Sequence, residues 1–196
     1  EGQELRFGLV RDGQPTGISF RGIPNGHEFT SLLLAVLNAD GQGKNFPDET
    51  TQRRIKALKG NIALKTYVSL TCTNCPDVVQ ALNLMSLINP NIRHEMIDGG
   101  LFQQEVSDLG IQGVPAVYCN GESLHIGRGD LGILLQKLED MVGSETDDNA
   151  EPVEHHHDVI VVGGGPAGAS AAIYSARKGL RVAVVAERIG GQVNDT

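Results

Sequence analysis

The feature that most constrains this chain is a Cys-x-x-Cys pair between an apolar run and a helix-like segment. Cys72 and Cys75 follow a β-branched stretch, residues 62–70, that predicts a strand. The helix expected over 76–88 would direct free backbone N–H groups toward the first sulfur, which favours its thiolate. Because thiolates attack disulfides, the pattern indicates reversible exchange, with Cys72 as the nucleophile and Cys75 as the more buried resolving thiol.

A zinc site is the main alternative use of these two thiols. Its remaining ligands would have to be Cys119 and His94, which are far from each other in the sequence. Structural zinc sites usually draw their second pair of ligands from another closely spaced couple. We therefore expect a redox pair and no metal, and we expect Cys119 to be a small buried residue without chemistry.

Composition excludes several classes of partner. The 196 residues carry a net charge of −8, which argues against nucleic acid, since phosphate binding needs a positive surface. No apolar run reaches the length of a transmembrane helix, so we expect no membrane partner. The chain has three cysteines, and two of them share one motif, which suits a reducing compartment and predicts a cytoplasmic protein.

The order of expected elements predicts an α/β protein with several segments. Residues 61–142 read β-α-β-α-β-β-α, with strands over 62–70, 92–97, 114–119 and 123–126 and helices over 76–88, 102–109 and 131–141. Residues 1–60 read strand, strand, helix, helix, over 5–10, 18–21, 28–37 and 48–58. Residues 143–157 are polar and predict a linker.

The last segment, residues 158–196, has the pattern of a dinucleotide-binding β-α-β unit. An apolar strand over 158–162 leads into three glycines, a helix and a second strand over 180–186. Gly163, Gly165 and Gly168 have the G-x-G-x-x-G spacing that lets a backbone approach a pyrophosphate, and Glu187 stands where an acid would bind a ribose hydroxyl.

The element order and the position of the two cysteines resemble the thioredoxin fold. Pro115, in Gly113-Val-Pro, stands where that family places a cis-proline facing the disulfide. More narrowly, the motifs resemble the flavoprotein subunit of alkyl hydroperoxide reductase. They are Thr71-Cys-Thr-Asn-Cys-Pro, Ile97-Asp-Gly-Gly, Gly113-Val-Pro-Ala-Val, Gly26-His-Glu-Phe, Ile173-Tyr-Ser-Ala-Arg-Lys-Gly and Glu187-Arg-Ile-Gly-Gly-Gln.

The resemblance implies a fold and a function. It implies a partial thioredoxin-like unit, a complete one, and an incomplete Rossmann-type β-α-β. It also implies electron transfer from NADH through FAD and a flavoprotein C-terminal module to the N-terminal cysteine pair, and then to a peroxidase partner of the peroxiredoxin type. It implies that Glu28 approaches the cysteine pair, because Thr66, at the position of the buried acid of thioredoxins, cannot accept a proton. It places Gly191 and Gln192 in the FAD-binding segment, and a homodimer is compatible with it.

The chain departs from the family pattern at both ends. The first unit lacks its opening β-α-β, and the second Cys-x-x-Cys and the NADH site are absent, so we expect a fragment that neither binds FAD tightly nor oxidises NADH alone. Two other readings stay open. One is an interaction domain that uses the fold without redox chemistry, and the other is a stand-alone FAD-binding protein. For Glu28 the alternative is a helix-start residue stabilised by the helix dipole.

Overall fold

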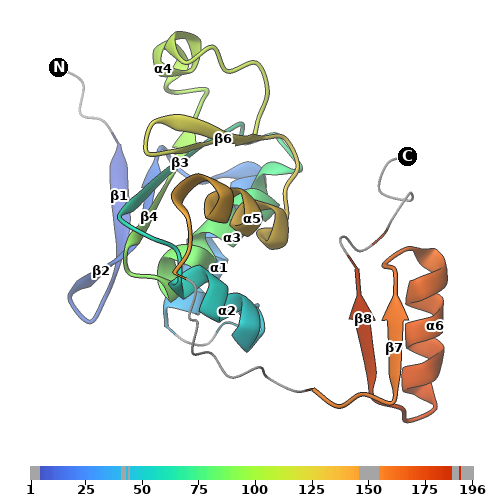
Figure 1. The fold of residues 1–196 in the computed structure, drawn as a ribbon. Coiled ribbons are helices and arrows are strands. Elements are labelled where there is room, and N and C mark those ends of the chain that lie inside the picture. Colours follow the sequence, from blue (N-terminus) through green and yellow to red (C-terminus); the bar gives the residue numbers. More distant parts are fainter. Residues whose placement is uncertain (1–4, 41–42, 44, 146–154, 187–189, 191–196) are drawn as a thin grey trace. The chain divides into compact units, whose positions relative to one another are not determined.

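The computed structural model describes residues 5–40, 43, 45–145, 155–186 and 190. The chain forms two compact units, residues 1–147 and 148–196, and each is described by itself (Figure 1). The expected α/β class is confirmed in both units. Among the described residues, no helix is long and apolar enough to span a membrane.

The first unit is built on a six-stranded mixed sheet in the order β1-β2-β4-β3-β5-β6. Its strands are β1 Arg6–Arg11, β2 Gln14–Arg21, β3 Ile62–Val68, β4 Ile92–Asp98, β5 Ala116–Cys119 and β6 Glu122–Ile126. The β2–β4 and β3–β4 pairs are parallel, and the other pairs are antiparallel. Both expected hairpins are confirmed, and Asp12-Gly13 and Asn120-Gly121 take positive φ at their turns.

This sheet joins the two segments that the sequence divides at residue 60. Strand β2 lies beside β4, with Phe20 opposite Met96, so residues of 1–60 and of 61–142 share one sheet and one core. The predicted boundaries at residues 60 and 142 stay predictions.

The helices follow the expected order with small differences in their bounds. They are α1 Phe29–Ala39, α2 Glu49–Lys56, α3 Cys75–Ile88, α4 Gln103–Asp108 and α5 Leu131–Val142. A 3-10 turn, η1 Gly26–Glu28, precedes α1, so the helix expected from Glu28 begins one residue later. Helix α2 ends before Leu58, because Leu58 forms an isolated bridge with Ser144 instead.

The core of the first unit lies on both faces of the sheet. On one face, residues from β3 and β4 pack with α2, α3 and α5, and Ile62, Met85 and Leu134 are fully or almost fully buried there. On the other face, Tyr67 and Ile97 pack with Val106 of α4 and with Phe102 just before it. Helix α3 therefore packs on the sheet from its start at Cys75, which fixes the position of the cysteine pair.

The second unit contains β7 Val159–Val162, α6 Pro166–Arg177 and β8 Val182–Val185, with β7 and β8 parallel. This is the expected β-α-β arrangement, with strands slightly shorter than the sequence indicates. Several large apolar side chains of this unit are exposed, including Val162 at 84% and Tyr174 at 65%. Within the described part of this unit, the two strands and one helix bury little of their own apolar surface.

Candidate redox site

Cys72 and Cys75 form a disulfide at the start of α3, with their Cα atoms 5.6 Å apart. Cys75 is the first residue of the helix and is fully buried, whereas Cys72 lies in the preceding turn and is partly exposed. Pro76 occupies the first turn of α3, where its missing N–H leaves no backbone partner unsatisfied. The structure thus shows the expected difference in burial between the two sulfurs, while their roles as attacking and resolving thiols stay predictions.

The strand that begins after Pro115 borders this pair. The Val114-Pro115 bond is cis, as the thioredoxin resemblance implies. The Cys72 Sγ lies 3.8 Å from the carbonyl oxygen of Val114. Strand β5 then runs beside β3, with Ala116 opposite Tyr67. The backbone before Pro115 therefore lies against the more exposed sulfur.

Glu28 is buried beside the start of α3. Its side chain is 0% exposed, and among the described residues neither carboxylate oxygen has a hydrogen-bond partner. The η1 turn that carries it is held against the loop before Cys72, because the His27 N–H donates to the Leu70 carbonyl at 3.1 Å. The negative charge of Asp77, in the first turn of α3, acts on it.

Burial dominates the electrostatics of Glu28. Loss of solvent raises the pKa of this carboxyl from 4.5 to about 7, Asp77 adds to the rise, and the polar Ser31 side chain opposes it in part. A carboxylate stabilised by a helix dipole would show the opposite shift. Burial thus outweighs any stabilisation by the helix dipole at this carboxyl, and the role of Glu28 stays a prediction.

Thr66 takes part in a buried polar network rather than in proton transfer to the cysteines. The His94 ring donates from Nδ1 to the Asn83 side-chain oxygen at 2.7 Å and accepts at Nε2 from the Thr66 hydroxyl at 2.8 Å. Burial lowers the pKa of His94 to about 3, so the ring is neutral. His94 is thus buried in the core with both ring nitrogens hydrogen-bonded.

Cys119 lies in the core, 1% exposed, and burial raises the pKa of its thiol. It is the small buried residue that the sequence indicates. Among the described residues, no group of three or more histidine, cysteine or acidic side chains could hold a metal ion.

One residue of the site was missed by sequence reasoning. The Arg128 guanidinium donates from Nε to the Asn74 side-chain oxygen at 2.7 Å, inside the Cys-x-x-Cys turn. The available signal was an arginine between two glycines, immediately before Asp130, a residue suited to capping a helix.

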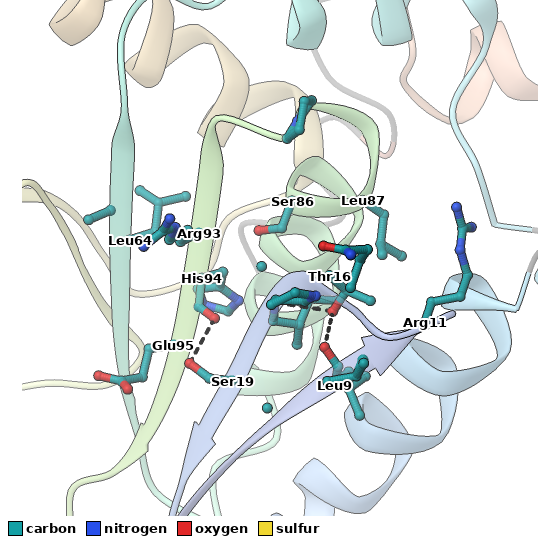
Figure 2. Close-up of a pocket in the computed structure, with 18 of the residues that line it drawn as sticks. Leu9, Arg11, Thr16, Ser19, Leu64, Ser86, Leu87, Arg93, His94 and Glu95 are labelled. Atoms are coloured by element: carbon teal, nitrogen blue, oxygen red, sulfur yellow. Dashed lines mark hydrogen bonds between the residues drawn. The ribbon is translucent and has the colours of Figure 1, made fainter.

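A groove of about 1180 Å³ lies elsewhere in the first unit. Figure 2 shows that it is bordered by residues of β1, β2, β4 and α3, among them Thr16, Ser86 and His94. Neither the two cysteines nor Glu28 lines it. The groove and the candidate redox site are therefore separate features.

The glycine loop of the second unit has the shape that the dinucleotide motif requires. Gly163 has a φ of +116°, and a Cβ at Gly168 would overlap the Gly163 carbonyl, so both positions need glycine. Gly165 precedes α6, whose N-terminus follows the loop directly. These residues fit the pyrophosphate of a dinucleotide such as FAD. Glu187, Gly191 and Gln192 lie outside the described residues, so their predicted roles stay predictions.

Family models match both units. A thioredoxin domain model matches residues 62–138, and an FAD dependent oxidoreductase model matches residues 158–194. An "NADH dehydrogenase" of Bacillus subtilis (strain 168) is 53% identical over 97% of this chain and 36% of its own length. The F subunit of the alkyl hydroperoxide reductase of Staphylococcus aureus (strain COL) is 52% identical with the same shares. The chain thus spans little more than a third of the length of these curated relatives.

Solved structures agree with this relationship. The NTD_N/C domain of alkylhydroperoxide reductase AhpF from Enterococcus faecalis superposes with a TM-score of 0.60 at 37% identity, covering 64% of this chain and 60% of that one. A protein disulfide oxidoreductase from Aeropyrum pernix, 20% identical, shares the fold with a TM-score of 0.59 over 65% of this chain and 56% of its own. The chain is therefore similar over 97% of its own length to F subunits of alkyl hydroperoxide reductases, and its two units match a thioredoxin domain model and an FAD dependent oxidoreductase model.

Proposed function

We propose that the first unit is the thiol–disulfide electron-transfer module of an NADH- and FAD-dependent alkyl hydroperoxide reductase, and that it acts as a disulfide oxidoreductase. The observation that carries the proposal is the asymmetric pair at the start of α3, with Cys72 partly exposed and Cys75 fully buried. In such a pair one sulfur forms a mixed disulfide with the partner, and the other sulfur then attacks it and restores the intramolecular disulfide.

The exchange step follows from this geometry. In the reduced chain, the Cys72 thiolate attacks one sulfur of a partner disulfide, forms a mixed disulfide and releases the partner's second sulfur as a thiolate. Cys75 then loses its proton and attacks the Cys72 sulfur, which breaks the mixed disulfide and releases the partner's first sulfur. Two electrons pass to the partner, which becomes a dithiol, and the Cys72–Cys75 disulfide is restored.

Glu28 is the group that we assign to the proton of Cys75. A base near neutral pKa is matched to proton transfer at physiological pH, and burial raises the pKa of Glu28 to about 7. Its carboxylate oxygens have no other partner, and η1 holds them beside the first turn of α3. The Thr66 hydroxyl is already hydrogen-bonded to His94. Glu28 therefore accepts the proton as Cys75 attacks, and returns it when the pair is reduced again.

Val114 and Pro115 provide a backbone surface for the partner. The Val114 carbonyl lies against Cys72, so an extended partner segment that brings its own sulfur to Cys72 lies next to this backbone. We assign Pro115 to the site on this ground, as a residue that shapes the surface without taking part in proton or electron transfer.

The electron source and acceptor follow from the family relationship. When bound to the flavoprotein module, FAD would supply the chemistry that carries two electrons from NADH to a disulfide, which is thereby reduced to a dithiol. In the second unit, Gly163, Gly165 and Gly168 would hold its pyrophosphate, with Glu187 at a ribose and Gly191 and Gln192 nearby in the sequence. The acceptor that we propose is a peroxidase of the peroxiredoxin type, consistent with the relatives named as alkyl hydroperoxide reductase.

A direct transfer assay tests the proposal. The chain is reduced with dithiothreitol, freed of reductant and mixed with a disulfide-form peroxiredoxin, and the thiols of both proteins are labelled with a maleimide and weighed by mass spectrometry. We expect two thiols to disappear from the chain as two appear in the peroxiredoxin. Cys119→Ala is the matched control, because Cys119 lies in the core away from the pair. A pair that does not cycle between dithiol and disulfide would favour an interaction domain, and stoichiometric bound FAD would favour a flavin-binding protein.

A further inference from the structure

Three hydrogen bonds hold the loop between β6 and α5, and two of them join it to the redox site. The Gly127 N–H donates to the Pro115 carbonyl at 2.8 Å. The His125 Nε2 lies 2.7 Å from the Arg128 carbonyl oxygen and donates to it. The Arg128 Nε donates to the Asn74 side-chain oxygen at 2.7 Å. The loop therefore joins Pro115, just before β5, to the turn between the two cysteines.

The glycines on either side of Arg128 are required by this conformation. Gly127 has a φ of +90°, a region that other residues rarely adopt. A Cβ at Gly129 would come within 2.7 Å of the His125 Nε2. Asp130 then caps α5 by accepting from the Ile133 N–H at 2.9 Å. The backbone on both sides thus determines where the Arg128 side chain starts, although the side chain itself is exposed.

The charge of Arg128 is not neutralised by a carboxylate. Within the residues that the structure describes, Arg128 forms no ion pair. The titratable and charged groups on η1, in the first turn of α3 and between the end of β6 and the start of α5 are His27, Glu28, Asp77, His125, Arg128 and Asp130. Of these, Asp130 is engaged as a cap, and Arg128 is the permanent cation.

We propose that Arg128 is a positioning residue of the redox pair, which orients the Cys-x-x-Cys turn through Asn74 and favours the Cys72 thiolate by its charge. The inference rests on the proposed exchange function. A nearby cation stabilises the thiolate and hence the reduced pair, so the couple becomes more oxidising. Arg128 itself is neither oxidised nor reduced and transfers no proton. The electrons still pass only between the partner and the two cysteines.

The test compares Arg128→Gln with the unmodified full chain. The rate at which iodoacetamide alkylates Cys72 in the reduced protein is measured as a function of pH, with the modified peptide identified by mass. We expect the apparent pKa of Cys72 to rise by about half a unit, so that alkylation below this pKa slows about threefold. The equilibrium with glutathione should move toward the disulfide by up to about the same factor.

Two further variants separate charge from orientation. Arg128→Lys keeps the charge and should keep most of the Cys72 reactivity. Asn74→Ala removes the hydrogen bond but leaves the cation. The matched control is Arg93→Gln. Arg93 is exposed near the start of β4, where it lies opposite Ala63, whereas the cysteine pair follows the other end of β3, at Val68. This variant removes the same charge at the end of the sheet away from the pair, so it should leave the alkylation rate of Cys72 unchanged.

Salt dependence provides the final criterion. An electrostatic effect of Arg128 should shrink when ionic strength rises from about 0.05 M to about 0.5 M. An unchanged Cys72 pKa in Arg128→Gln, an equal shift in Arg93→Gln, or a shift that salt does not alter would overturn the inference. If the unmodified chain cycles normally and Arg128→Gln matches it, only the inference fails. If the unmodified chain shows no reversible couple, the proposed function fails with it.

Discussion

Replacing Glu28 by glutamine should stabilise the protein above neutral pH and at the same time slow its chemistry. The carboxyl is fully buried without a hydrogen-bond partner, and its pKa rises from 4.5 to about 7. Between these values the folded chain binds a proton that the unfolded chain does not, so stability falls as pH rises through this range. Above about pH 7 the ionised group costs on the order of 3 kcal/mol, because burial raises its pKa from 4.5 to about 7 and each pH unit between these values is worth about 1.4 kcal/mol.

This cost is an upper bound, because water that reaches the carboxylate reduces it. Glutamine is neutral at every pH, so the variant does not lose stability as the pH rises through this range. We expect Glu28→Gln and the unmodified chain to have similar free energies of unfolding near about pH 4.5, and the variant to be more stable by up to about 3 kcal/mol near about pH 8. The same variant should transfer electrons more slowly, because Cys75 loses its proton acceptor.

Guanidinium unfolding of the oxidised chain, followed by circular dichroism at the two pH values, measures the difference. Glu122→Gln is the matched control, since Glu122 is exposed in β6. A stability difference between Glu28→Gln and the unmodified chain that is the same at both pH values would show that Glu28 does not ionise with a raised pKa. Unchanged transfer rates at both pH values would remove Glu28 from the proposed mechanism.

Three further outcomes follow from the same site. Cys72→Ser should abolish transfer to a disulfide partner, while Cys75→Ser should accumulate a mixed disulfide visible by non-reducing electrophoresis; a fully active Cys75→Ser would contradict the assignment of Cys75. A chain ending at residue 147 should keep the dithiol couple in glutathione titration, because the pair lies within the first compact unit, and loss of the couple would assign the second unit to the site. Burial lowers the pKa of His94 to about 3. The free energy of unfolding should therefore fall by about 1.4 kcal/mol per pH unit as the pH falls below about 6.5. In His94→Gln the free energy of unfolding should not show this dependence on pH. An unaltered dependence in acid unfolding would refute the role given to His94.

Local sequence patterns determined the elements of this protein. The apolar run before Cys72, the apolar positions of α3 and the turn residues Asp12-Gly13 and Asn120-Gly121 act over a few residues, so periodicity and turn chemistry predict them directly. The exposed and buried sulfurs follow in the same way, because a residue in the turn faces outward while the first residue of a packed helix faces the core. The cis bond before Pro115 was expected only from the family resemblance, because a local sequence pattern does not distinguish cis from trans.

Tertiary structure alone decided which distant residues surround the pair. Periodicity does not show that the carboxylate of Glu28 is buried without a partner, that His94 joins Thr66 to Asn83, or that Arg128 bonds Asn74. Each of these features depends on strand order, on register or on the path of a glycine-containing loop, and none of these follows from a local pattern. The physical reason is that local propensity determines the conformation of each segment, whereas burial and electrostatics at a site depend on the segments that the folded sheet brings beside it.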